Sequence, residues 1–450
     1  MTTTQTASDV STLIDGLILE ENHDLPLCRL QLTLRVGSTS DQTAQGTAAS
    51  GGPAQMGLCN FASELQRRGA GSRSRAQIDE TLDGLGAGLS IVCWHDQVLY
   101  EVTSLREHFE RAVEILADVV QRPTYPGDES ERLRRELLAN LDDLRDDDSG
   151  LLHRFFSREL YGETPYGRPV AGTEESTQAL DLDGAHAWHR HHIVTGNMIA
   201  GAAGAISQSE VEHLLRQHFA QIPAGPRRDE PIPSPPQRKG RRVLIVDKPE
   251  RTQSQILIGQ LAPHWKDPSW LPLHVSTVAF GGTFTARLMD EVRVKRGLSY
   301  GASARLGNGR GQRSLYAHVF PSAEQTAETV ELVLRLYEEW AEKGLRPGEL
   351  DFIRSYLQKS HAFTVQTADD RLGLRTRLQV CDMPLDHEKT YPARVASVSA
   401  SDIEQAMKTW LLPDDLLITI VATADSVLPS LQKLPGLRDA EFEVVPYDSF

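Results

Sequence analysis

The chain has 450 residues, of which 40% are hydrophobic and 24% are charged, and its formal net charge is −15. This length exceeds what one ordinary hydrophobic core supports, so the composition predicts a soluble globular protein of two or more domains. Acidic and basic residues are interspersed, which argues against nucleic acid or an anionic membrane as a partner and suits basic or neutral peptide ligands.

The beginning of the chain carries no basic segment followed by an apolar one, and no apolar run reaches 18 residues. The sequence as given therefore predicts a protein of the cytoplasm, or of the periplasm if a leader has been removed. Its four cysteines form no CxxC pair and lie mostly in apolar runs, which predicts buried thiols rather than a disulfide framework. They are Cys28, Cys59, Cys93 and Cys381.

The first recognisable elements are a strand and an amphipathic helix. LQLTLRVG alternates Leu30, Leu32, Leu34 and Val36, which predicts a half-buried strand. GLCNFASELQRRG, residues 57–69, repeats its apolar positions at the i, i+3, i+4, i+7 spacing of a helix. The neighbouring face of this helix carries Asn60, Ser63 and Glu64, and taken alone such a face is typical of any surface helix.

A histidine-rich segment, HAWHRHH, places His186, His189, His191 and His192 within seven residues. Helical spacing would bring His186 and His189 together as a pair of metal ligands, which leaves open an independent zinc enzyme. No acidic or cysteine ligand accompanies them, so a cluster on the surface at a helix end is the favoured interpretation.

A proline-rich and charged segment at 223–240 predicts a linker, and the same order of elements appears on both sides of it. Each half has an early strand, a helix that stops at Pro-Gly-acidic, a further charged helix and a late apolar strand. Pro126 and Pro347 lie 221 residues apart, and Ile199 and Ile418 lie 219 apart. The repeat predicts two homologous α/β domains, 1–222 and 241–450.

The segment at 279–306, AFGGTFTARLMDEVRVKRGLSYGASARL, predicts a helix over 285–295 capped by Gly297, and then a strand. Arg293 lies on the last helical turn and Tyr300 just beyond it. They have ordinary structural roles available, but together they are also a guanidinium and a phenol that suit binding of a peptide carbonyl and its oxyanion. Gly281 and Gly282 lack the Lys-Ser/Thr of a phosphate loop.

Four motifs together resemble the pitrilysin/insulinase-like peptidases with the inverted zinc motif, a group that includes mitochondrial processing peptidase and bacterial two-chain forms. They are GLCNFASELQRRG, YGETPYGRPVAGTEES, WHRHHIVTGNM and GGTFTARLMDEVRVKRGLSY. The resemblance runs over nearly the whole chain. It implies an α+β fold of two homologous domains, each a mixed, mostly antiparallel sheet flanked by helices, forming half of a clam-shell chamber. It also implies that HAWHRHH is ordinary scaffold.

The family's zinc helix carries H-x-x-E-H, in which two histidines bind zinc and the glutamate acts as general base. The shared frame puts Asn60 and Glu64 at the histidine positions and Ser63 at the base. The third ligand, a glutamate on a later helix, corresponds to Asn140 or Leu141. An amide is a poor zinc ligand and a serine is a poor base, so the resemblance implies no zinc and no cofactor in this chain.

The other part of the family's site is retained. Arg293 and Tyr300 keep the separation at which active relatives use an Arg/Tyr pair on the substrate, and Gly281 and Gly282 would leave room for a bound peptide, although turn glycines need no such role. The resemblance therefore implies a zinc-free subunit, inactive alone, that joins a homologous zinc-bearing subunit to cleave peptides. The alternative is an inert structural subunit like the core subunits of respiratory complexes. Whether the isolated chain forms a homodimer stays open.

Overall fold

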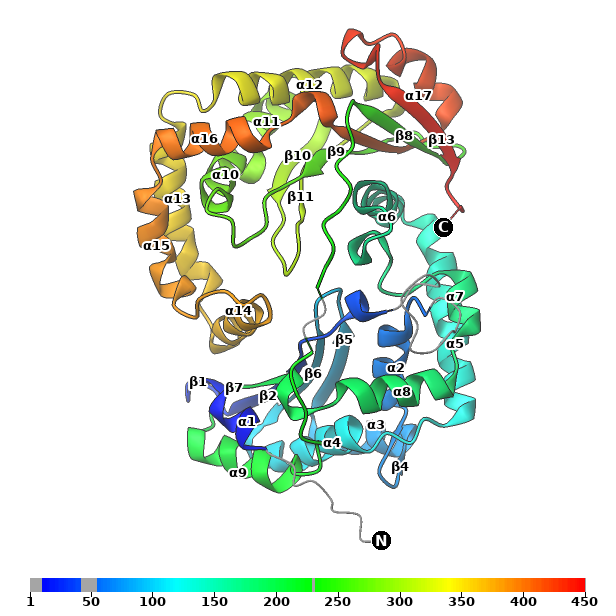
Figure 1. Cartoon of the computed structure of the whole chain (residues 1–450), viewed down its shortest axis with the longest axis vertical. Helices are drawn as coiled ribbons and strands as arrows, with labels where there is room; N and C mark the ends of the chain where they lie inside the picture. Colours follow the sequence, from blue (N-terminus) through cyan, green and yellow to red (C-terminus); the bar gives the residue numbers. More distant parts are fainter. Residues whose placement is uncertain (1–9, 42–54, 229–230, 450) are drawn as a thin grey trace. The chain divides into compact units, whose positions relative to one another are not determined.

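The computed structural model describes residues 10–41, 55–228 and 231–449. These residues form two compact units, each with its own sheet and flanking helices (Figure 1). Unit 1 draws on 1–141, 168–232 and 363–388, and unit 2 on 142–167, 233–362 and 389–450.

Both units have a mixed sheet, and the order of the strands in the two sheets is the same. The first strand of each sheet along the chain pairs in parallel with the fifth, and the fifth, second, fourth and third follow as antiparallel neighbours. This identity confirms the predicted fold of two homologous, mostly antiparallel domains. The strands of unit 1 are β1 (Ile18–Glu21), β2 (Leu27–Leu34), β5 (Gly88–Cys93), β6 (Val98–Leu105) and β7 (Met198–Gly204). Those of unit 2 are β8 (Arg242–Asp247), β9 (Gln255–Leu261), β10 (Ser299–Leu306), β11 (Ser314–Pro321), β12 (Leu417–Ala422) and the additional β13 (Glu441–Pro446).

Amphipathic helices cover the sheets, and a short hairpin of β3 (Gly69–Ala70) and β4 (Arg73–Ser74) follows the helix predicted at 57–69. The helices of unit 1 are α1 (Ser11–Asp15), α2 (Leu58–Gln66), α3 (Arg75–Leu85), α4 (Phe109–Gln121), α5 (Gly127–Asp143), α7 (Glu174–Ala179), α8 (Leu182–His192), α9 (Gln208–His218) and α14 (Ala368–Val380). Those centred in unit 2 are α6 (Asp148–Tyr161), α10 (Trp270–Thr277), α11 (Arg287–Met289), α12 (Thr326–Lys343), α13 (Glu349–Thr364), α15 (His387–Ser397), α16 (Ala400–Trp410) and α17 (Ala424–Leu431).

The two units exchange helices, so neither is continuous in sequence. Helix α6, from the first half of the chain, packs on β9 and β12 of unit 2, and α14, from the second half, packs on β1 and β7 of unit 1 (Figure 1). Lys248 on unit 2 binds Asp148 at the start of α6 at 2.6 Å. The compact units therefore differ from the predicted continuous halves by two exchanged segments, 142–167 and 363–388.

Helix α14 also changes the environment of β2. The predicted apolar face is buried as expected, with Leu30, Leu32 and Leu34 fully inaccessible. The opposite face is buried too, because the Gln31 amide donates to the Thr376 hydroxyl of α14 at 2.6 Å. The prediction of a half-buried strand is therefore wrong. A polar side chain is tolerated on the covered face because it has a hydrogen-bond partner.

Replacing Thr376 by Val is expected to lower the free energy of unfolding by about 1–2 kcal/mol, because the buried Gln31 amide loses its acceptor while the volume is kept. Urea titration followed by circular dichroism measures the shift. The matched control is Thr409→Val, at an exposed threonine of α16 whose hydroxyl bonds only its own helix. Equal shifts for the two variants would contradict a role for this contact between α14 and β2.

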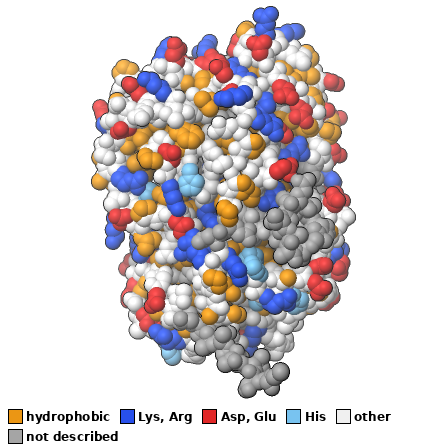
Figure 2. All heavy atoms as spheres, viewed as in Figure 1, with side chains coloured by type: hydrophobic (Ala, Val, Ile, Leu, Met, Phe, Trp, Pro, Cys, Tyr) orange, Lys and Arg blue, Asp and Glu red, His pale blue; other side chains and the backbone are white. Residues whose placement is uncertain are grey.

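No helix in the described part of the chain is both long and apolar enough to cross a bilayer. On the face drawn in Figure 2, acidic and basic side chains are interspersed over the described surface. Such a distribution gives little long-range attraction for a polyanion.

Candidate active site

Helix α2, the predicted zinc helix, is anchored from outside by a carboxylate. Asp41 accepts hydrogen bonds from the backbone N–H groups of Gly57 at 2.8 Å and Cys59 at 2.9 Å, at the beginning of the helix. Burial raises the pKa of Asp41 to about 7, more than these hydrogen bonds and the charge of Arg168 lower it. Sequence reasoning missed Asp41, because 15 residues separate it from the helix that it caps.

This raised pKa predicts a pH dependence of stability. Between about pH 4, the ordinary pKa of an aspartate, and the raised value, folded Asp41 keeps a proton that the unfolded chain has lost, so the free energy of unfolding falls as pH rises. Asp41→Asn does not titrate. We expect the wild type to lose stability relative to this variant between about pH 4.5 and pH 7.5. Thermal midpoints that stay parallel over this range would contradict the expectation.

The structure places the three degenerate positions of α2 in one small area. Asn60 and Ser63 are buried, and the Ser63 hydroxyl donates to the Asn60 carbonyl at 3.1 Å, so this hydroxyl is committed to its own helix. Burial raises the pKa of Glu64, against smaller opposing effects of the Asn60 side chain and the Arg68 charge. None of these side chains is an activated base at neutral pH, which agrees with the predicted loss of base function.

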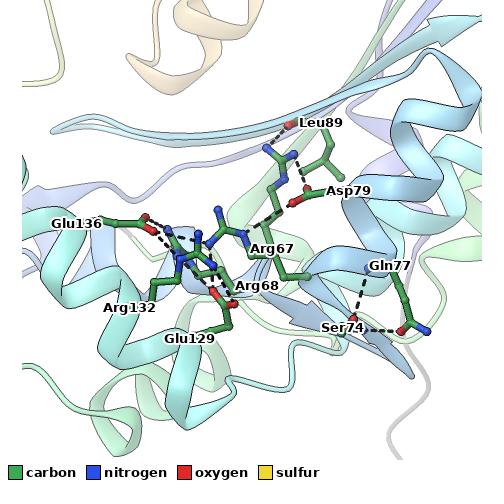
Figure 3. A network of polar contacts seen from close by, with 10 residues as sticks. Arg67, Arg68, Ser74, Gln77, Asp79, Leu89, Glu129, Arg132 and Glu136 are labelled. Carbon is green, nitrogen blue, oxygen red and sulfur yellow. Dashed lines mark hydrogen bonds and ion pairs between the residues drawn. The ribbon is translucent and has the colours of Figure 1, made fainter.

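An arginine joins α2 to α5 beside Glu64. The Arg68 guanidinium binds Glu129 at 3.4 Å and Glu136 at 2.5 Å, and Arg75 also contacts Glu129 at 3.1 Å (Figure 3). Glu136 raises the pKa of Glu64, so Glu136 is the α5 residue whose charge reaches the degenerate site. Asn140 is exposed one helical turn further along and makes no hydrogen bond to these side chains among the described residues. The seven-residue spacing of Glu129 and Glu136 was the signal that could have identified this face.

These side chains line a pocket of about 380 Å³ next to β5, formed by Glu64, Arg67, Arg68, Arg75, Asp79 and Ile91. Arginines balance its carboxylates, as Arg67 does for Asp79 at 2.9 Å. Across the described ranges, no three His, Cys, Asp or Glu side chains stand close enough together to hold a metal ion. The donor set of the pocket therefore does not fit zinc, which needs deprotonated ligands that no cation already occupies.

The histidine-rich segment forms the end of α8 and serves packing. The His189 ring bonds the Val120 carbonyl at 2.8 Å, His186 stacks edge-on against Tyr125, and His192 is buried against Trp188. Burial lowers the pKa of His192 to about 3. The prediction of a surface cluster is wrong for His192, because α8 turns this side chain toward the core. No metal-binding group forms here within the described residues.

In unit 2, Arg293 and Tyr300 lie together. Arg293 stands on a π-helical turn, η7 (Asp290–Val294), after α11, and Gly297 ends this turn at a φ of 62°. The predicted inward residues Leu288 and Val292 are fully buried, which fixes this helical segment. The Arg293 guanidinium lies 4.7 Å from the centre of the Tyr300 ring. The distance to the ring of Phe284, a residue that sequence reasoning missed, is 5.2 Å.

This cation and its two rings are open to solvent. Tyr300 is 79% exposed and Phe284 is 65% exposed, although large apolar side chains are usually covered. Arg293 has no carboxylate partner among the described residues and only stacks on the rings. Stacking keeps the orientation of the guanidinium without using its N–H donors, so these remain available to a ligand.

The paired glycines close a second π-helical turn, η6 (Val278–Gly282), that follows α10. A Cβ on Gly281 would meet the Ala304 backbone nitrogen of β10 at 2.6 Å. A Cβ on Gly282 would meet the Val278 side chain at 3.0 Å. Gly281 therefore has a packing reason of its own, which is the close approach of η6 to β10. A peptide-binding role for either glycine stays a prediction.

Two family models match the chain: "Insulinase (Peptidase family M16)" over residues 17–174, and "Peptidase M16 inactive domain" over residues 179–357. Among curated proteins, the non-peptidase homolog YmxG of Helicobacter pylori is 23% identical over 90% of this chain and 91% of its own length. An uncharacterized zinc protease of Mycobacterium leprae is 27% identical over 68% and 69%. A crystal structure of a peptidase M16 inactive domain from Pseudomonas fluorescens shares the fold, with a TM-score of 0.82, 23% identity and coverage of 92% and 96%.

Proposed function

We propose that this chain, which belongs to the insulinase family of peptidases (M16), is the zinc-free subunit of a two-chain metallopeptidase. A homologous zinc-bearing subunit would provide the metal chemistry, because the degenerate site of this chain does not fit a metal. This chain would contribute Arg293 and Tyr300 to the site for peptide substrates, with Gly281 and Gly282 beside them. Alone, as a monomer or a homodimer, it would be inactive.

The observation that carries this proposal is the contrast between the two sites. At the degenerate zinc site, charged side chains are engaged with one another, as Arg68 is with Glu129 and Glu136. At the second site, Arg293 and Tyr300 are brought together and left open, with no charged partner among the described residues. A pair that served only folding would gain stability from being covered or ion-paired, so its exposure favours a ligand.

The roles of the pair follow from its chemistry. The Tyr300 hydroxyl is a neutral donor on an exposed ring, suited to the oxygen of a peptide carbonyl as that oxygen gains negative charge during cleavage. The Arg293 guanidinium is a permanent cation with several N–H donors in a plane, suited to holding the peptide backbone in one orientation. Binding and oxyanion stabilisation would therefore come from neighbouring groups on one chain.

The first test is cleavage of an unstructured fluorogenic peptide by this chain, by a homologue from the same cell that carries HxxEH, and by their equimolar mixture. Activity that appears or rises sharply only in the mixture supports the proposal. The absence of any gain on mixing favours the alternative of an inert structural subunit. Finding the chain in a respiratory complex, without a peptidase partner, would strengthen this alternative.

A further inference from the structure

A second set of polar groups lies on the sheet of unit 2, on the strand that begins beside Arg293. In the pairing of β10 with β11, Ser303 lies opposite His318, and Arg305 lies opposite Tyr316. The alternate residues of both strands, such as Ala304 and Ala317, are buried on the other face. Because side chains alternate along a strand, Ser303, Arg305, Tyr316 and His318 share one face.

Helix α6 adds a third group to this face. The ring of His153 lies 5.8 Å from that of Tyr316 and 6.0 Å from that of His318. Burial, followed by other cationic groups that include Arg305, lowers the pKa of His318 to about 4. The same two causes lower the pKa of His153, which the charge of Asp147 opposes. At neutral pH both imidazoles are therefore neutral hydrogen-bonding groups, and Arg305 is the charge at this place.

Arg305 is exposed and makes no hydrogen bond or ion pair with the described residues. Other arginines of the same unit are paired: Arg287 binds Glu349 at 2.8 Å, and Arg242 binds Glu159 at 3.1 Å. An unpaired guanidinium beside two half-covered imidazoles and a phenol is a set of donors without an acceptor of negative charge. A carboxylate is the group that complements it.

We propose that Arg305, together with His318 and His153, binds an aspartate or glutamate side chain of a peptide that lies along this sheet face. The inference rests on the proposed function and adds a preference in substrate sequence. Tyr300 and Arg305 are five residues apart on β10, about 16 Å in an extended strand. The acidic residue would therefore lie about four or five residues from the peptide bond held by Arg293 and Tyr300.

Binding of peptides to the full chain tests this preference without the partner subunit. The probes are fluorescein-labelled 14-residue peptides of Gly, Ser, Ala and Leu, with one Glu moved through the sequence and a Gln version of each. We expect Glu to tighten binding about tenfold over Gln at one or two positions, measured by fluorescence anisotropy. General charge attraction cannot produce this result, because the chain has a net charge of −15.

Arg305→Gln should abolish the preference for Glu and leave the affinity of the Gln peptides within about twofold. Arg335→Gln, at an exposed arginine of α12, is the control and should keep the preference. Equal affinity of Glu and Gln peptides at every position, or a preference that survives in Arg305→Gln, would overturn the inference. Cleavage of a neutral peptide by the two-chain mixture would still support the proposed function in that case, so the two failures are distinguishable.

Discussion

Replacing Tyr300 by Phe is expected to lower kcat of the two-chain complex by about 10²–10³-fold and to change KM by less than about threefold. The ring and its contact with Arg293 stay, and only the hydroxyl is lost. A donor that acts on the oxyanion contributes more to the transition state than to the bound substrate, so its loss appears in kcat. Initial rates over a range of peptide concentrations separate the two constants.

The matched control for this experiment is Tyr356→Phe, at a second solvent-exposed tyrosine of unit 2, on α13. This change removes the same hydroxyl from the same kind of ring and should leave both constants within about twofold. Arg293→Ala should mainly raise KM, because it removes a group that orients the substrate. If Tyr300→Phe retains full activity in the complex, Tyr300 has no part in catalysis and the structural alternative gains.

The parts of the fold that could be predicted from the sequence are those set by local pattern. The helix at 57–69, the buried Leu288 and Val292, and the Gly297 cap follow from spacing and from backbone preferences within a few residues. The repeated order of elements predicted the duplication, and the two sheets confirm it.

The parts that could not be predicted depend on contacts between distant segments. Nothing local in β2 indicates that α14, more than 300 residues later, covers its second face at Gln31. The position on α5 that faces α2 was misplaced by one helical turn, from Glu136 to Asn140, because counting along the chain does not fix how a helix is rotated. Phe284 gave no signal, since only the folded chain brings its ring beside Arg293.

The polar network beside the degenerate zinc site gives the second large expected effect. Arg68→Met should lower the free energy of unfolding by about 2–3 kcal/mol, because it removes the cation that joins α2 to α5 and keeps most of the apolar stem. The Arg68 side chain is only 10% exposed, so the carboxylate of Glu129 loses a partner that water does not fully replace. The shift in the urea midpoint measures the loss.

Arg67→Met, at the preceding residue, is the internal control. Its ion pair with Asp79 has both side chains about 40% exposed, and such pairs contribute less than about 1 kcal/mol. The Arg68 hydrogen bond is the largest effect that lowers the pKa of Glu136, so this stabilisation exists above the ordinary glutamate pKa and is lost as pH falls through the lowered value. The difference between wild type and Arg68→Met should therefore narrow in acid. Equal losses for the two variants, or a gap that widens in acid, would show that the ion pairs of Arg68 do not hold this site together.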